Sequence, residues 1–246
     1  MKYAIFSDIH SNLEALTAVM EDMLSQDVTH TICLGDIVGY AANPKECLQI
    51  VRTIGCPVIM GNHDQMATIT PSEKMGFNQS AMEGIDFTIS RLNKEDIDYL
   101  RQLPLKLHVQ QFTCVHDSLD DPGSWCYVTC VNTAQISFNY QRTRICFNGH
   151  THVPRIFEKN GSVVECPQKY PFACTNSNSK YLINVGSVGQ PRDGDSRASY
   201  AIFTPTEKGM GTVELRRVEY DIEKASEKIL REGLPARTAT RLTTAR

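Results

Sequence analysis

The chain begins with an apolar run that leads straight into charged and imidazole side chains: Lys2-Tyr3-Ala4-Ile5-Phe6-Ser7-Asp8-Ile9-His10. Residues 2–6 predict a buried strand, and the apolar residues after Asn12 recur at the spacing of an amphipathic helix. The same order follows again, with a strand expected at 31–34, a helix at 44–54 and a third strand at 57–60. Two consecutive strand, helix, strand units predict a sheet that starts parallel, with right-handed crossovers.

The pattern changes farther along the chain. Residues 71–103 are expected to be helical, with a break at Asn93 that caps a second helix. Closely spaced strands are then expected over residues 105–110, 111–115, 144–148, 153–158, 162–165, 180–185, 198–203 and 212–219. The dipeptide Asn160-Gly161 is typical of a tight hairpin.

The end of the chain is expected to hold one more amphipathic helix, from about Asp221 to just before Gly233. The Thr- and Arg-rich residues 235–246 are expected to form a mobile tail. No repeat or linker interrupts the sequence, so residues 1–246 are interpreted as one domain, a sandwich of sheets flanked by helices.

Composition limits the classes of function. The chain has 246 residues, 41% of them hydrophobic and 22% charged, which is typical of a packed globular protein. A net charge of -3 gives no general attraction to nucleic acid or to an anionic membrane. The sequence has no signal peptide and no long apolar stretch, so we expect a cytoplasmic protein. The nine cysteines are expected to be reduced, and Cys126 with Cys130 lacks the second pair of a zinc ribbon.

Polar residues of a few types follow five of the expected strands. The segments are Ser7-Asp8-Ile9-His10, Gly35-Asp36, Gly61-Asn62-His63-Asp64, His116 and Asn148-Gly149-His150-Thr151-His152. The carboxyl ends of parallel strands converge on one crevice, so these side chains can meet there. Five of the seven histidines lie in these segments, whereas His30 and His108 lie outside and are expected to be structural.

The residue types indicate the chemistry of this predicted site. Carboxylate, imidazole and amide groups without thiolate suit manganese, iron or zinc in a hydrolytic site. The set is too large for one ion, and two ions about 3.5 to 4 Å apart need a shared carboxylate. Asp36, alone on its loop, is the expected bridge. Each short motif taken alone is also typical of an ordinary turn.

Taken together, these segments resemble the calcineurin-like metallophosphoesterase superfamily, whose pattern is D-x-H, G-D, G-N-H-[DE], a lone H and G-H-x-H. Residues 184–195 also resemble a segment of its small bacterial phosphodiesterase and diadenosine tetraphosphatase-like subgroup. The resemblance implies an α+β fold, a four-layer αββα sandwich of two mixed sheets flanked by helices.

The resemblance also implies residue roles. One metal ion would be bound by Asp8, His10, Asp36 and His152. The other would be bound by Asp36, Asn62, His116 and His150. His63 would protonate the leaving oxygen or hold the phosphoryl group, and Asp64 would orient His63. Two divalent ions are expected, manganese first, with iron, zinc, nickel or cobalt as alternatives.

The expected reaction is hydrolysis of a phosphodiester or nucleotide-type phosphate ester by a hydroxide that bridges both ions, with Asn62 and His63 neutralising phosphoryl charge. Arg192 is a candidate phosphate clamp or a salt-bridged turn residue, and Asn12 a candidate substrate contact or a helix cap. Asp117, which follows His116, departs from the related pattern and could alter the surroundings of the metals. Val185 departs from it as well.

Two alternatives remain open at this point. The first is a phosphomonoesterase or phosphoprotein phosphatase, because the same metal centre serves either ester. The stretch 117–131, with Trp125 and Tyr127, is expected to form the wall that discriminates between substrates, although such aromatics are also typical of a core. The second is a non-catalytic protein-binding scaffold, which the intact set of ligand positions disfavours.

Overall fold

Strand β1 (Tyr3–Phe6) pairs with a parallel strand on one side and an antiparallel strand on the other. It belongs to the first of two mixed sheets in the computed structural model, which describes residues 1–69, 78–167, 170–206 and 210–246. In spatial order this sheet contains β2 (His30–Cys33), β1, β10 (Ala198–Pro205), β11 (Gly211–Val218) and β8 (Phe172–Cys174).

The second sheet has a parallel centre and antiparallel edges. In spatial order it contains β3 (Lys106–Val109), β4 (Phe112–Val115), β5 (Ile145–Asn148), β9 (Ser179–Asn184), β6 (Arg155–Asn160) and β7 (Val163–Glu165). Strands β4, β5 and β9 run parallel to one another, so their carboxyl ends share one edge of the sheet. Strands β6 and β7 form the hairpin predicted at Asn160-Gly161.

Alternating side chains of β1 explain how the sheets are stacked. Tyr3 and Ile5 face an apolar core between the two sheets, which also contains Phe112 and Phe147 of the second sheet. Ala4 and Phe6 point the other way, into a core beneath the helices. Because neighbouring residues of a strand point to opposite faces, a strand buried on both faces reads as a continuous apolar run.

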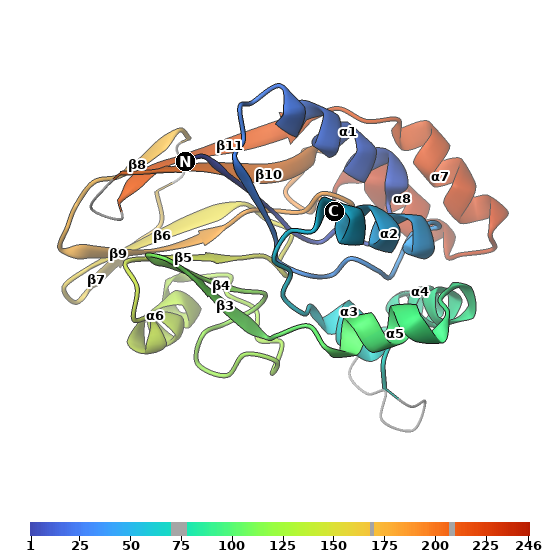
Figure 1. Ribbon diagram of the computed structural model, residues 1–246, viewed down its shortest axis with the longest axis horizontal. Helices are drawn as coiled ribbons and strands as arrows, with labels where there is room; N and C mark the ends of the chain where they lie inside the picture. Colours follow the sequence, from blue (N-terminus) through green and yellow to red (C-terminus); the bar gives the residue numbers. More distant parts are fainter. Residues whose placement is uncertain (70–77, 168–169, 207–209) are drawn as a thin grey trace.

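Helices cover the outer faces of the sandwich. They are α1 (Leu13–Leu24), α2 (Pro44–Ile54), α3 (Asn62–Met66), α4 (Gln79–Arg91), α5 (Lys94–Arg101), α6 (Val131–Tyr140), α7 (Ile222–Arg231) and α8 (Ala236–Thr244). Helix α1 packs on β10 and β11, and α6 packs on β6, β7 and β9. Figure 1 shows α6 on one side of the molecule and α1 and α7 on the opposite side, with α3, α4 and α5 grouped at one end. The predicted αββα sandwich is confirmed.

Some elements differ from the expectation. Residues 57–60 join the first sheet only through an isolated bridge between Cys33 and Val58. Strand β8 and helices α3 and α6 had no sequence prediction, and the helical prediction over 71–77 lies outside the described residues.

The end of the chain also differs from the expected mobile tail. It forms helix α8, which packs against α7 and buries Thr238, Ala239 and Leu242. Among the helices in the described ranges, none is both long and apolar enough to cross a membrane.

Candidate metal centre

The predicted ligand loops come together at the carboxyl ends of strands from both sheets. The first sheet supplies Asp8 and His10 after β1 and Asp36 after β2. The second sheet supplies His116 after β4, and His150 and His152 after β5. Asn62 and His63 begin the short helix α3. All of these side chains are buried.

A first group of ligand atoms comes from Asp8, His10, Asp36 and His152, all within 4.8 Å of one another. Asp8 Oδ1 lies 3.3 Å from His152 Nε2 and 3.8 Å from His10 Nε2. Two carboxylates and two imidazoles at this spacing form a set that can hold a divalent ion.

A second group contains Asp36, His116 and His150, with ligand atoms again within 4.8 Å of one another. Asp36 Oδ2 lies 3.4 Å from His116 Nε2 in this group and 3.6 Å from His10 Nε2 in the first group. The Asp36 carboxylate is therefore common to both groups, in the arrangement that a bridging ligand requires.

Hydrogen bonds fix the orientation of the imidazole rings. The Nδ1 atoms of His10, His116 and His152 lie 3.2, 2.6 and 2.6 Å from the carbonyl oxygens of Val38, Leu34 and Gln190. A ring nitrogen beside a carbonyl must donate its proton, so in the neutral ring Nε2 is the atom left to bind a metal ion. His150 is reversed, because its Nε2 contacts Trp125 O at 3.0 Å and leaves Nδ1 as the ligand atom.

Several buried polar atoms in the site lack a hydrogen bond within the described part of the chain. They include Asp8 Oδ1, Asn62 Oδ1 and His116 Nε2. Buried polar atoms almost always have a partner, so a cluster of unsatisfied oxygen and nitrogen atoms is the setting that a bound cation requires. The donor set thus fits divalent metal ions, and Asn62, predicted as a ligand, has its oxygen available.

The pKa shifts point the same way. Burial alone would raise the pKa of Asp36, but the charges of His116 and His63 hold it well below its ordinary value. Burial opposes protonation of His116, yet Asp36 and Asp8 raise its pKa to about 10. Burial lowers the pKa of His150 to about 3, with the charge of His116 acting in the same direction. The two carboxylates thus stabilise positive charge at the centre of the site.

The ligand loops adopt an unusual backbone. Asp8, His10, Asp36, His150 and His152 all have φ between 49° and 67°, a left-handed conformation that costs energy for side chains other than glycine. Such strain persists only where the surrounding structure enforces it, and it is concentrated here at the candidate ligands.

Two glycines permit the close approach of these loops. A Cβ atom on Gly61 would lie 2.2 Å from Asp36 Oδ1, and one on Gly149 would lie 2.1 Å from Ser7 Oγ. Both glycines belong to the segments quoted from the sequence. Any larger residue at either position would push a ligand loop out of place.

His63 lies beside the first group rather than within it. Its ring is 4.6 Å from the His10 ring and 4.5 Å from the Tyr40 ring, measured between centroids. Its backbone N–H donates to Asp36 Oδ1 at 2.8 Å. Burial lowers the pKa of His63 to about 4. Tyr40 had no sequence prediction as part of the site. Its left-handed backbone conformation, which directly follows Gly39, is visible only in the structure.

Asp64 has a role that the sequence did not suggest. Its Oδ1 accepts from the backbone N–H groups of Ile37 and Val38, and its Oδ2 accepts from that of Gly61. Burial raises the pKa of this carboxyl to about 7. The Asp64 side chain therefore ties the loop after β2 to the start of α3.

Asn12 and Arg192 lie in different settings. Asn12 Oδ1 accepts from Ala15 N and its Nδ2 donates to Gly189 O, so Asn12 caps α1 and holds the 186–191 segment in place instead of presenting its amide to a substrate. Arg192 Nη2 donates to Gln190 Oε1 at 2.8 Å and reaches the Tyr40 hydroxyl at 3.4 Å. The guanidinium thus lies over a ring that itself contacts His63.

The stretch 117–131 forms one wall of the site, where the sequence placed it. The Tyr127 ring stacks on His150 with centroids 4.1 Å apart, and about half of the Tyr127 side chain is exposed. Asp117 Oδ2 accepts from Trp125 N at 2.7 Å and from Gly123 N at 3.3 Å. The Oδ2 atom of Asp117 therefore holds the wall loop in place.

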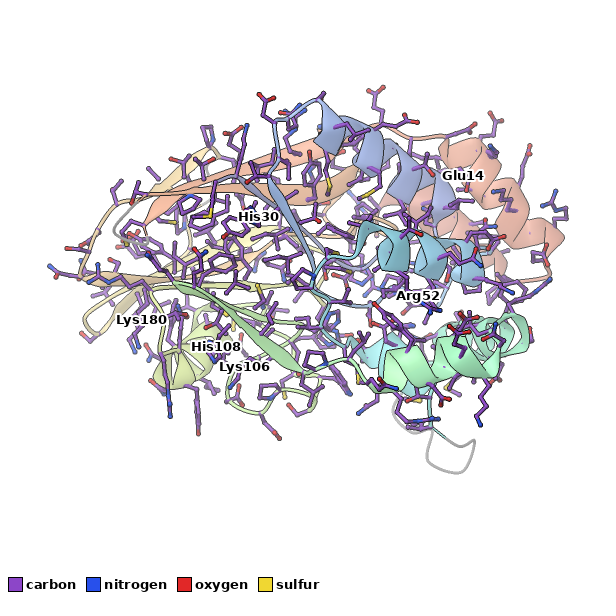
Figure 2. The ribbon with its side chains drawn as sticks, viewed as in Figure 1. Glu14, His30, Arg52, Lys106, His108 and Lys180 are labelled. Carbon is purple, nitrogen blue, oxygen red and sulfur yellow. The ribbon has the colours of Figure 1, made fainter. Side chains whose placement is uncertain are left out.

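The two remaining histidines lie apart from these groups, on exposed parts of strands. Figure 2 labels His30 on β2 and His108 on β3. His30 stacks on Tyr3, and His108 contacts the hydroxyl of Thr113 at 3.1 Å. Neither belongs to either group of candidate ligands.

Comparisons with known proteins agree with this geometry. The calcineurin-like phosphoesterase superfamily domain matches residues 1–208, so the chain belongs to this family and shares its class, the phosphoester hydrolases. The protein MJ0912 of Methanocaldococcus jannaschii is 38% identical over 244 residues, covering 97% of this chain and 96% of its own.

Two solved structures are similar over the whole chain. A metallophosphoesterase from Sphaerobacter thermophilus has 36% identity and a TM-score of 0.86, with 100% of this chain and 99% of that chain covered. A hypothetical protein, PH1004, from Pyrococcus horikoshii has 18% identity and a TM-score of 0.79, with 100% and 98% covered, which shows the shared fold.

Proposed function

We propose that the protein is a dinuclear metal-dependent phosphodiesterase that hydrolyses a phosphodiester or a nucleotide-type phosphate ester. The observation that carries this proposal is the Asp36 carboxylate, which belongs to both groups of candidate ligands. Asp8, His10 and His152 would complete one metal site, and Asn62, His116 and His150 the other. When bound, two divalent ions would lower the pKa of a water molecule and offset phosphoryl charge. Manganese is the first candidate, with iron, zinc, nickel and cobalt as alternatives.

The residues around the ligands would position the ester. Asn62, with a buried amide oxygen that lacks a hydrogen bond in the described part of the chain, would serve as a ligand whose NH₂ group faces the phosphoryl oxygens. His63, beside His10, would hold the phosphoryl group or protonate the leaving oxygen. Arg192, over Tyr40, would bind a phosphate oxygen of the substrate through its guanidinium.

The aromatic wall favours an ester with a flat leaving group. Tyr127 stacks on His150 and still exposes about half of its side chain. An exposed ring beside the candidate metals can stack against a base or an aryl group. This supports a nucleotide-type or aryl diester over a phosphoprotein as substrate.

The test compares Asp36→Asn with the wild type and with Asp98→Asn, a matched change at a surface residue that forms an ion pair with Arg101. Bis(p-nitrophenyl) phosphate and p-nitrophenyl phosphate are the substrates, with Mn²⁺ added, and bound metal is measured by elemental analysis. We expect Asp36→Asn to lose metal and at least about 100-fold in kcat/KM, because a bridging ligand orients both ions. Full activity in this variant would contradict the bridging role, and a preference for the monoester would favour the phosphomonoesterase alternative.

A further inference from the structure

Two arginines from distant parts of the chain share one neutral acceptor. Arg192 Nη2 donates to Gln190 Oε1 at 2.8 Å, and Arg241 Nη1, on helix α8, reaches the same oxygen at 3.4 Å. Neither guanidinium forms an ion pair with an Asp or Glu side chain among the residues that the structure describes. Arg241 Nε donates to the main-chain oxygen of Arg246. The pair therefore keeps a net positive charge.

The positive charge of Arg192 acts on the neighbouring guanidinium of Arg241. Burial lowers the pKa of Arg241, and the charge of Arg192 lowers it further. Two guanidinium groups held together against this repulsion are a common arrangement for binding anions, because a phosphate can accept hydrogen bonds from both.

The pair lies next to the candidate metal centre. Arg192 N donates to His152 O, so the backbone of Arg192 lies against the segment that carries the candidate ligand His152. Its guanidinium lies 5.7 Å from the Tyr40 ring centroid, and that ring contacts His10 and His63. An anion bound by Arg192 and Arg241 would thus be a neighbour of the group held at the metals.

An open hollow of about 530 Å³ is lined in part by Arg192. Its lining also includes Val153 and Pro154, directly after His152, together with Arg155 and Arg246. Asp193 contributes a carboxylate to the lining, but this carboxylate is paired with Arg217. Positive charge therefore predominates along this hollow, and it has room for part of a ligand.

We propose that Arg192 and Arg241 form a second phosphate subsite, so that the preferred substrates carry two or more phosphoryl groups. This inference rests on the proposed function, since the scissile phosphoryl group would lie at the metals and a further one at the arginine pair. Helix α8 supplies Arg241 and lies beyond residues 1–208, which match the family. Helix α8 would therefore contribute to substrate specificity while the metal ligands perform the reaction.

The test uses Arg241→Gln on the full-length protein, with Arg231→Gln as control. Arg231 ends helix α7, is exposed, and loses the same charge when replaced. Hydrolysis of ATP, with three phosphoryl groups, is compared with that of bis(p-nitrophenyl) phosphate, with one, at fixed free Mn²⁺. Binding of tripolyphosphate to the metal-free protein is measured separately by calorimetry, so that one readout is independent of catalysis.

We expect Arg241→Gln to lower the ratio of kcat/KM for ATP to that for the single-phosphate ester about tenfold, and to weaken tripolyphosphate binding by a similar factor. Arg231→Gln should leave both quantities within about twofold of the wild type. Equal behaviour of the two variants would overturn the subsite while leaving the proposed function in place.

A different result would affect the proposed function itself. If the wild type with Mn²⁺ hydrolyses neither ATP nor bis(p-nitrophenyl) phosphate, both the proposed function and this substrate class are wrong. In that case calorimetry still decides on the anion site: tight tripolyphosphate binding that depends on Arg241 supports it, and binding that does not depend on Arg241 refutes it.

Discussion

The Nε2 atoms of His10 and His152 lie 3.0 Å apart, although the residues are 142 positions apart in the chain. Each ring has its Nδ1 beside a carbonyl oxygen, so both Nε2 atoms carry lone pairs that point at each other. A divalent ion bound beside these two atoms could be ligated by both, which agrees with their place in the first group of candidate ligands.

Metal binding is expected to stabilise the fold. A ligand that binds only the folded state at a free concentration 100 times its Kd adds about 2.7 kcal/mol to the free energy of unfolding. We expect the melting temperature to rise on addition of Mn²⁺ to protein treated with chelator, and to rise far less for Asp8→Asn. Scanning calorimetry measures both, and an unchanged melting temperature in the wild type would count against the site.

The variant His63→Ala is expected to separate catalysis from metal binding. His63 touches the His10 and Tyr40 rings but belongs to neither group of candidate ligands. Removing a positioned acid or hydrogen-bond donor costs about 10² to 10⁴ in rate. We expect kcat to fall by this amount with bound metal unchanged by elemental analysis. Loss of metal together with activity would instead show that His63 is a ligand.

Asp117 is expected to act through the wall loop. In Asp117→Ala the N–H groups of Gly123 and Trp125 lose their acceptor, which costs about 1 to 3 kcal/mol of unfolding free energy. Asp117→Asn keeps an acceptor oxygen and should lose less. Denaturant unfolding measures this order, and kcat should follow it, because Trp125 O accepts from the candidate ligand His150. The reverse order would exclude this role.

A pH-dependent contribution to stability is expected far from the metals. Asp22 on α1 accepts from Arg216 and from the Tyr200 hydroxyl, and these hydrogen bonds, that of Arg216 first, lower its pKa below 3.8. The contribution is therefore complete above the ordinary pKa and is lost as the pH falls through the lowered one. Asp22→Asn should cost about 1 to 2 kcal/mol at pH 7.

The same comparison at low pH tests the sign. As the pH falls from the ordinary pKa of Asp22 through its lowered pKa, the wild type protonates Asp22 as well, so the difference in unfolding free energy between the two proteins should shrink. Urea unfolding at pH 7 and at pH 3 measures it. A difference that grows toward low pH would contradict the assignment of the shift to Arg216 and Tyr200.

Most of the site could be predicted because its charged and polar residues stand where apolar residues are expected. Asp8, Asp36 and His116 follow apolar strands directly, where the chain is still buried, and a buried charge requires a partner. Tyr40 and the pairing of Arg192 with Arg241 could not be predicted, because each depends on contacts between segments that are distant in sequence.

The missed elements have physical causes as well. Helix α6 leaves Ile136 and Tyr140 exposed, so its apolar residues do not mark one face clearly. Helix α8 is rich in Thr and Arg, and its buried face is made of small side chains and Leu242, a composition also typical of a tail. Residues 57–60 have the composition of a strand, but a single bridge to Cys33 is their only pairing within the described chain.

The candidate ligands come from both sheets, Asp8 and Asp36 from one and His116 and His150 from the other. A pair of bound ions would therefore link the two sheets, and the apolar layer between the sheets would determine how far apart the linked loops are. Metal sites tolerate only about 0.2 Å of change in their bond lengths. The thickness of that layer is set by residues such as Phe112 and Phe203, which lie outside both groups of candidate ligands. It would therefore set the distance between ligands that come from different sheets.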